Sequence, residues 1–223
     1  MDFLKEPLRD LLQFLYNFTQ SWGWSIILLT VLIKLVLFPT TIKQFKVMNK
    51  MKELQPKLKE IQEKYKDKPE EYQRRTMELY KKEKANPFGS CLPMIIQMIV
   101  LVAFFQLLQD AKFLQAMGDA SFLGIILKDK NNIILTVLSA VTTFFQQKLT
   151  TPTTGNDPQQ QTFLYIMPLM LAWFTYTVNA GVGLYWVTSN AIGIIQQYII
   201  NEYFIVKEHI QEKKVNSDEE KEK

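Results

Sequence analysis

A single lysine lies in the middle of an apolar run near the amino terminus of this 223-residue chain. Lys34 is about ten residues from the start of that run and about eight from its end. On a helix this puts it roughly 12 to 15 Å from either end. A charge at such depth in lipid costs on the order of 2.5 to 3.5 kcal/mol, so its environment must compensate it. The chemistry it offers is attraction of an anion.

An acidic partner for Lys34 is missing from the other apolar runs, because Asp110 and Glu202 lie only at their ends. The remaining way to keep the ammonium charged is water, so we predict a hydrated groove at membrane depth. Loss of the proton from the ammonium is the alternative.

Polar residues at helical spacing could line this groove. Thr30 is one turn before Lys34, and three polar residues of the last apolar run fall on one stripe. The predicted groove residues are Lys34, Thr30, Gln147, Trp186, Asn190, Gln97 and Gln197. Each polar residue singly is equally well explained by an interhelical hydrogen bond, but together with an unpaired Lys34 they favour a groove.

Five apolar runs must position these residues, and most are long enough to cross a hydrocarbon core roughly 30 Å thick. They cover residues 24–42, 88–109, 131–148, 162–178 and 182–201, and the third is short if it is counted only from Ile133 to Gln147. The predicted fold is therefore an all-α integral membrane protein with five transmembrane helices, and Pro39 should kink the first near its inner end.

The distribution of Lys and Arg orients the chain, because basic residues beside short loops stay in the cytoplasm. Segments 43–87 and 202–223, together with Lys148 beside the loop 149–161, hold 20 of them, whereas 1–23 and 110–130 hold 5. We therefore expect the amino terminus outside, 179–181 as an outer turn, and the carboxyl terminus in the cytoplasm.

Residues 1–23 predict an amphipathic helix ahead of the first span. Its apolar positions repeat at steps of four and three, which makes one stripe: Leu4, Leu8, Leu11, Leu15 and Phe18. We expect this helix to lie in the outer membrane interface, or alternatively to pack on the outer ends of the bundle.

Residues 43–87 predict a cytoplasmic helical hairpin with a heptad seam. Pro69 suits the start of its second arm, and Pro56 should bend or break the first. With 14 basic and 8 acidic residues, the insert suits anionic headgroups or a nascent chain. Its candidate contact residues are Lys57, Lys59, Arg74 and Arg75. The alternative is a solvated loop, and direct nucleic-acid binding is not expected.

The motifs of common enzymes are missing from the sequence. It has no phosphate-binding loop, HExxH pattern or serine elbow, and the single histidine, His209, lies in the polar tail. We therefore expect no enzyme activity, no cofactor and no metal site.

Several stretches resemble the YidC/Oxa family of membrane protein insertases, from about Ile26 to Tyr203. They include "LTVLIKLVLFPTTIKQ" around Lys34, "MKELQPKLKEIQEKY" in the hairpin, "LYKKEKANPFGSCLPMIIQM", "FFQQKLTTPTTGNDPQQQ" and "GLYWVTSNAIGIIQQ". The resemblance implies a groove open to cytoplasm and lipid, with a basic residue in the first span. Many members have arginine where this chain has Lys34, and Thr30, Trp186 and Gln147 match groove positions.

The resemblance implies a membrane protein insertase and chaperone in a bacterial plasma membrane, of the short form without a large extracytoplasmic domain. Its expected partners are the lipid bilayer and nascent membrane proteins with acidic translocated tails. The ribosome, the Sec translocon and the signal-recognition machinery are further candidates, although the short, acid-rich tail argues against strong ribosome binding. The rival functions are an anion-binding transporter or channel and an assembly factor without translocation activity.

Overall fold

The protein is built almost entirely of helices, which confirms the predicted all-α class. The computed structural model describes residues 2–85, 92–150 and 158–221, and within them nine helices and one short β hairpin follow the chain. They are α1 (Asp2–Thr19), α2 (Trp22–Val36), α3 (Phe38–Lys64), α4 (Pro69–Lys82), α5 (Leu92–Leu108), α6 (Ala111–Met117), β1 (Ser121–Phe122), β2 (Ile125–Ile126), α7 (Ile133–Thr150), α8 (Pro158–Thr177) and α9 (Ala180–Lys221).

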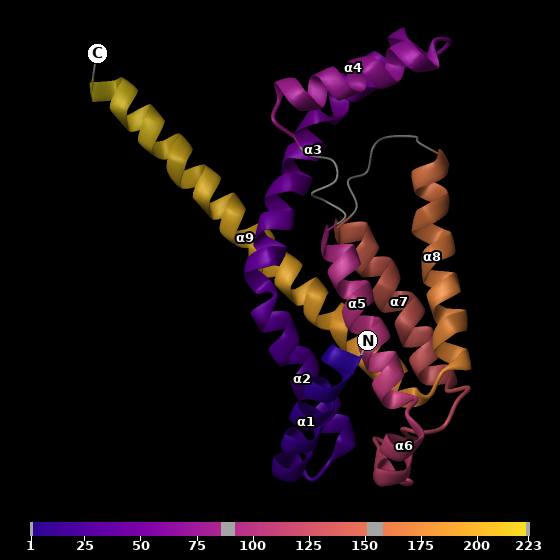
Figure 1. Ribbon diagram of the computed structural model, residues 1–223. Helices are drawn as coiled ribbons and strands as arrows, with labels where there is room; N and C mark the ends of the chain where they lie inside the picture. The colour runs from indigo at the N-terminus through magenta and orange to yellow at the C-terminus, as the bar shows by residue number, and fades with distance from the viewer. Residues whose placement is uncertain (1, 86–91, 151–157, 222–223) are drawn as a thin grey trace.

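The helices form a bundle with two distinct ends (Figure 1). The α3–α4 hairpin, the start of α8 and the far part of α9 lie toward one end, whereas α1 and α6 lie at the other. These two groups are the segments that the charge count places on the cytoplasmic and outer sides. The direction in which the bundle sits in a membrane stays a prediction.

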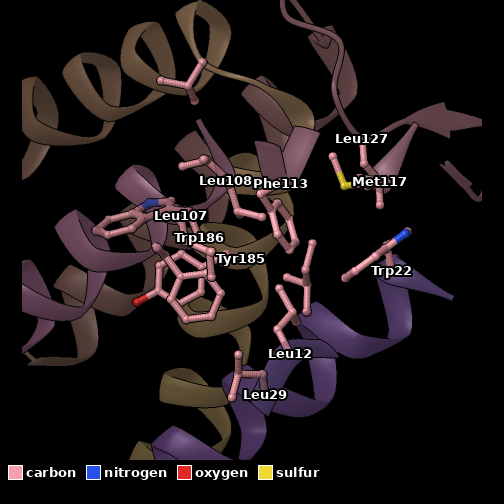
Figure 2. Close-up of a cluster of buried hydrophobic side chains, with 14 of the residues drawn as sticks. Leu12, Trp22, Leu29, Leu107, Leu108, Phe113, Met117, Leu127, Tyr185 and Trp186 are labelled. Carbon is pink, nitrogen blue, oxygen red and sulfur yellow. The ribbon is translucent and has the colours of Figure 1, made fainter. Parts of the chain in front are cut away.

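A hydrophobic core fills the end of the bundle that carries α1 and α6. Figure 2 shows Leu12, Trp22, Leu107, Leu108 and Phe113 converging there from four helices, with all five side chains at most 5% exposed. The Trp22 ring stacks on Tyr16 and meets Phe113 edge to face, with centroid separations of 4.1 and 5.1 Å. Close packing of this kind leaves few voids, so this end of the bundle is closed by side chains.

Helix α1 packs against α2 and α5. Leu12 and Leu15 are buried in the core, whereas Leu11 is 39% and Phe18 84% exposed. The face that α1 buries is therefore rotated from the predicted stripe. It is the face that contacts α2 and α5. This packing favours the alternative in which α1 docks on the bundle, and its location in the membrane interface stays a prediction.

The first predicted span is bent. Helices α2 and α3 meet at Leu37 with an angle of 58° between them, and Pro39 occupies the first turn of α3. Proline has no N–H and its ring crowds the carbonyl four residues earlier, which explains a break at this point. The predicted kink is therefore found next to Pro39. Beyond it, α3 leaves the bundle as the first arm of the hairpin.

The structure decides between the two effects expected of Pro56, a bend or a break. Helix α3 continues without interruption through Pro56 to Lys64, so Pro56 does not break this arm, and a bend there stays a prediction. A long helix tolerates one missing hydrogen bond when the turns on both sides are formed. Helix α4 begins at Pro69 with Glu70 and Glu71 in its first turn, as expected for a helix N-terminus.

The segment after α5 has more structure than an extracytoplasmic loop. The Asp110 carboxylate accepts the backbone N–H groups of Lys112 and Phe113 at 3.0 and 3.2 Å and so caps α6. A two-stranded hairpin follows, with Phe122 opposite Ile125. The Phe122 ring lies against Gly23 so closely that a Cβ there would be 2.1 Å from it, so the turn packs directly on α2.

Length and composition identify fewer spans than the five predicted. Among the described residues, α7 alone is long and apolar enough to cross a membrane, and the number rises to three if the bent pairs α2–α3 and α5–α6 each count as one. The predicted boundary at 87–88 and most of the loop 149–161 lie outside the described residues. The five-span topology therefore stays a prediction.

Candidate functional site

Lys34 lies in the last turn of α2 and reaches across to two other helices. Its Nζ donates a hydrogen bond to Oε1 of Gln97 on α5 at 3.1 Å. Nε2 of Gln97 in turn donates to the Tyr185 hydroxyl at 3.1 Å and to the Ser189 hydroxyl at 3.0 Å, both on α9. This chain of contacts, which we call the Lys34 network, joins α2, α5 and α9 through one cation and three neutral groups.

No carboxylate forms an ion pair with Lys34 within the part of the chain that the structure describes. The ion pairs found there lie at the ends of the bundle and in the hairpin, for example Lys5 with Asp110 and Lys57 with Glu83. A hydrogen bond to a charged group contributes roughly 1.5 to 3 kcal/mol, so Gln97 offsets part of the burial cost without removing the charge. Lys34 therefore remains able to attract an anion.

The backbone of Lys34 is held as well. The last carbonyls of a helix have no partner within it, and at the end of α2 the Gln196 side chain donates from Nε2 to the Lys34 carbonyl at 3.0 Å. Thr30, one turn earlier, is 1% exposed and donates its hydroxyl to the Ile26 carbonyl at 2.7 Å. Helix α9 thus contacts both the side-chain partner and the backbone of Lys34.

A second polar cluster joins α9 to α7. Nε1 of Trp186 donates to the Thr143 hydroxyl at 3.0 Å. Nδ2 of Asn190 donates to Thr143 at 2.8 Å and to Thr142 at 3.2 Å. Trp186 and Asn190 follow Tyr185 and Ser189 by one residue, which turns them about 100° around the helix. The two clusters therefore share the same turns of α9 on different sides of it.

Two glutamines of α7 carry unpaired groups. Oε1 of Gln146 and Oε1 of Gln147 are buried, with no hydrogen-bond partner among the described residues. The Gln146 amide lies against Gly193, where a Cβ would be 2.6 Å from Nε2. A buried, unpaired acceptor is unfavourable without water or a ligand. These two oxygens could therefore accept hydrogen bonds from a molecule that enters the bundle beside α7.

Four of the seven predicted groove residues divide between the two clusters, and Thr30, Gln147 and Gln197 belong to neither. The structure brings Lys34 together with Gln97, and Trp186 together with Asn190, but these pairs face different helices. Gln197 is buried, and its Nε2 contacts Asn201 on its own helix at 3.5 Å. Trp186 and Asn190, two members of the stripe expected on α9, therefore meet α7 at the same threonine, and Tyr185 and Ser189 form a second polar face beside them.

The predicted hairpin residues are mostly engaged within the hairpin. Lys57 on α3 pairs with Glu83 after α4 at 2.6 Å, and this hydrogen bond lowers the pKa of the Glu83 carboxyl. Arg74 and Arg75 pair along α4 with Glu71 and Glu78. Lys59 is exposed. Attraction of headgroups by these residues would compete with pairing inside the hairpin.

Several residues of the two clusters were not predicted as site residues. Tyr185 resembles a core aromatic by its position, and it does stack on Phe104 with a centroid separation of 4.2 Å. Its spacing of four from Ser189 is the available signal, because the two residues share one helix face. Thr143, at the same spacing from Gln147, carries a similar signal.

Comparisons with known proteins agree over most of the chain. A family model described as 60Kd inner membrane protein matches residues 14–208. A Campylobacter jejuni protein named Membrane protein insertase YidC is 38% identical over 93% of this chain and 39% of its own length. A protein of the same name from Fusobacterium nucleatum is 39% identical over 90% of this chain and 98% of its own length.

A solved structure has the same fold. It is described as "Active YidC insertase crystal structure with the first transmembrane domain resolved", and it matches with a TM-score of 0.70 and 24% identity over 88% of this chain and 46% of that one. At that identity the likeness concerns the fold alone. The chain thus spans well under half of the Campylobacter protein and nearly all of the Fusobacterium one.

Proposed function

This chain belongs to the 60Kd inner membrane protein family, which is the YidC/Oxa family, and from that membership we propose that it inserts nascent membrane proteins into a bacterial plasma membrane. Its closely matched relatives carry the name membrane protein insertase. The observation that carries the proposal is the Lys34 ammonium, which is bound to the neutral Gln97 amide inside the helix bundle.

The proposed substrate is a membrane protein with a short acidic tail that must cross the bilayer. The tail enters a hydrated groove from the cytoplasm, drawn by Lys34. A close charge pair gains about 4 kcal/mol at an effective dielectric of 20, before desolvation is subtracted. Lysine acts here as a point charge, without the planar fork of arginine, so attraction rather than geometry selects the tail.

The proposed path for the apolar part of the substrate runs along the bundle surface into lipid. Large apolar side chains are exposed on the helices concerned, such as Leu35 on α2, Val141 on α7 and Ile199 on α9. Each leucine of the substrate that leaves water for lipid favours insertion by a few tenths of a kcal/mol. The buried core around Leu12 and Phe113 supports a groove that is closed toward the outer side.

The proposed orientation has the amino terminus outside and the carboxyl terminus in the cytoplasm. Helix α1 then lies at the outer surface and the α3–α4 hairpin in the cytoplasm, where its surplus of positive charge meets anionic lipid and the incoming chain. In this reading the protein is a non-enzymatic insertase and chaperone. Contacts with ribosomes or the Sec translocon would be additional.

The test compares Lys34→Ala and Lys34→Arg with the native protein in proteoliposomes. Two single-span substrates are used that differ only in whether the translocated tail carries aspartates or asparagines. Lys34→Ala should lower insertion of the acidic-tail substrate by about tenfold, since even part of the ~4 kcal/mol of attraction suffices for this. Lys34→Arg should retain most of it.

Equal insertion of the acidic-tail substrate by all three proteins would contradict the electrostatic step. Flux of small anions through liposomes that contain the native protein, without insertion of either substrate, would instead favour a transporter or channel. Crosslinks to folded partners but none to nascent chains would favour an assembly factor.

A further inference from the structure

The amide of Gln97 is held with one fixed polarity. Its oxygen faces the Lys34 ammonium at 3.1 Å, and its nitrogen donates to two hydroxyl oxygens, those of Tyr185 and Ser189. A primary amide has two N–H donors, and both are used here. Turning the amide over would let the two hydroxyls donate to its oxygen instead, but it would point N–H donors at a cation, so the oxygen stays toward Lys34.

The groups that orient Gln97 are themselves fixed by packing. Tyr185 is 1% exposed and stacks on Phe104, which is fully buried, with ring centroids 4.2 Å apart. Ser189 is 1% exposed one turn later on α9. The position of the amide therefore follows from the packing of α5 against α9 and is independent of any substrate.

We propose that Gln97 is a positioning residue, which holds the Lys34 ammonium as a neutral stand-in for the carboxylate of a substrate. This inference rests on the proposed function and adds that charge selectivity is set by a pair, the lysine and the amide. The amide keeps the ammonium at one place beside α5 and α9. It does so without neutralising the charge that attracts the acidic tail.

An amide suits position 97 better than a carboxylate or an apolar side chain would. A glutamate of the same shape would neutralise the charge of the ammonium and leave little attraction for a guest. A leucine would leave the ammonium without an acceptor, and its flexible stem would carry it toward the nearest polar surface. An ammonium has three donors, so a carboxylate, which accepts more strongly than an amide, can bind beside Gln97 or replace it.

The experiment measures the ratio of acidic-tail to neutral-tail insertion for full-length variants in proteoliposomes, with the two matched substrates described above. Gln97→Glu should lower this ratio by about tenfold, to the value of Lys34→Ala, because a built-in carboxylate occupies the cation. Gln97→Leu should lower it by roughly threefold, since the charge remains but is no longer held in place. A general folding defect would lower insertion of both substrates and leave the ratio unchanged.

Gln106→Glu is the matched control, because it makes the same change on the same helix at an exposed position away from Lys34. It should keep the native ratio. A native ratio for Gln97→Glu overturns the inference. If Lys34→Ala also keeps the native ratio, the electrostatic step of the proposed function fails with it, whereas a low ratio for Lys34→Ala alone rejects only the role of Gln97.

A second variant tests the role of Gln97 if the Gln97→Glu protein inserts neither substrate. Tyr185→Phe combined with Ser189→Ala removes both acceptors of the amide nitrogen and leaves Lys34 and Gln97 intact. Release of the amide should lower the ratio by roughly twofold to threefold. A native ratio in this double variant overturns the inference.

Discussion

Lys34 shows how a membrane protein can hold a partly buried charge without a countercharge. The Gln97 amide offsets part of the cost of burying the ammonium, whereas Gln196 pairs with the backbone carbonyl of the same residue. Neither partner is ionised, so the positive field persists inside the bundle. A neutral environment of this kind stabilises the folded protein and still leaves it attractive to an anion.

The second polar cluster makes a separate prediction about stability. Thr143→Val removes the hydroxyl that accepts from both Trp186 and Asn190 and leaves the shape nearly unchanged. Leaving buried donors unpaired costs about 1 to 3 kcal/mol, which should appear as a lower free energy of unfolding in bicelles. Thr142→Val is the control, because it removes one longer contact to Asn190, and its loss should be smaller. Equal losses would contradict the assignment of Thr143 as the shared acceptor.

The sequence predicts the charged residue of the site better than it predicts the contacts of that residue. The depth of Lys34 and the lack of an acid in the other runs are visible in single apolar segments, and they mark the residue. Its bond to Gln97 depends on how α2, α5 and α9 pack, which periodicity does not determine. Tyr185 was missed because a buried tyrosine in an apolar run has the pattern of a core residue.

At the scale of elements, α6 and α1 are tied to the end of α5 through one carboxylate. Asp110 accepts from the Lys5 side chain and caps α6. These hydrogen bonds, first that from Lys5 and then that from the Phe113 backbone, lower the pKa of the Asp110 carboxyl. Because the folded-state pKa is depressed, the stabilisation is present above the ordinary value of 3.8 and is lost as the pH falls through the lower folded value.

The prediction is that Asp110→Ala increases hydrogen exchange at the first amides of α6 at neutral pH. Asp110→Asn should retain most of the protection there, because an amide oxygen still caps the helix although the ion pair with Lys5 is lost. Protection in the native protein should persist at pH 5 and fall only well below pH 4. Loss of protection between pH 7 and pH 5 would assign the effect to another group.

The contact between the β turn and α2 makes a prediction at the same scale. Gly23→Ala should destabilise the protein by roughly 1 to 3 kcal/mol, the usual cost of overpacking, since the new Cβ meets the base of the Phe122 side chain. Gly193→Ala is the comparison, because its Cβ meets the movable end of Gln146. Thermal unfolding in detergent should show the larger loss for Gly23→Ala, and the reverse order would contradict this packing.

The helices were easier to predict from the sequence than the way in which they pack against one another. The heptad seam and Pro69 indicated the α3–α4 hairpin, and Pro39 indicated the bend of α2. The face that α1 turns toward the bundle could not be predicted, because Leu11 and Leu12 are equally apolar and only the neighbouring α2 and α5 decide between them. The hairpin β1–β2 has two residues in each strand, which is too short for any alternation to appear.

For the whole molecule, the proposed orientation predicts opposite accessibility of its two ends. In a background with Cys91→Ser, which removes the single native cysteine, Lys59→Cys on α3 should react with a membrane-impermeant maleimide only after the cells are opened. Leu123→Cys, at the turn between β1 and β2 and 85% exposed in the native protein, should react in intact spheroplasts. The opposite pattern would reverse the proposed topology.

The length of α9 has a mechanical consequence. At about 1.5 Å per residue its 42 residues extend for about 63 Å, roughly twice the thickness of a hydrocarbon core, and Figure 1 shows its far part projecting to one side, away from the bundle. The helix is continuous from the projecting arm to the segment that packs against α2 and α7. A load on the arm would therefore act on the segment that carries Ser189 and Gln196, whose side chain donates to the Lys34 carbonyl.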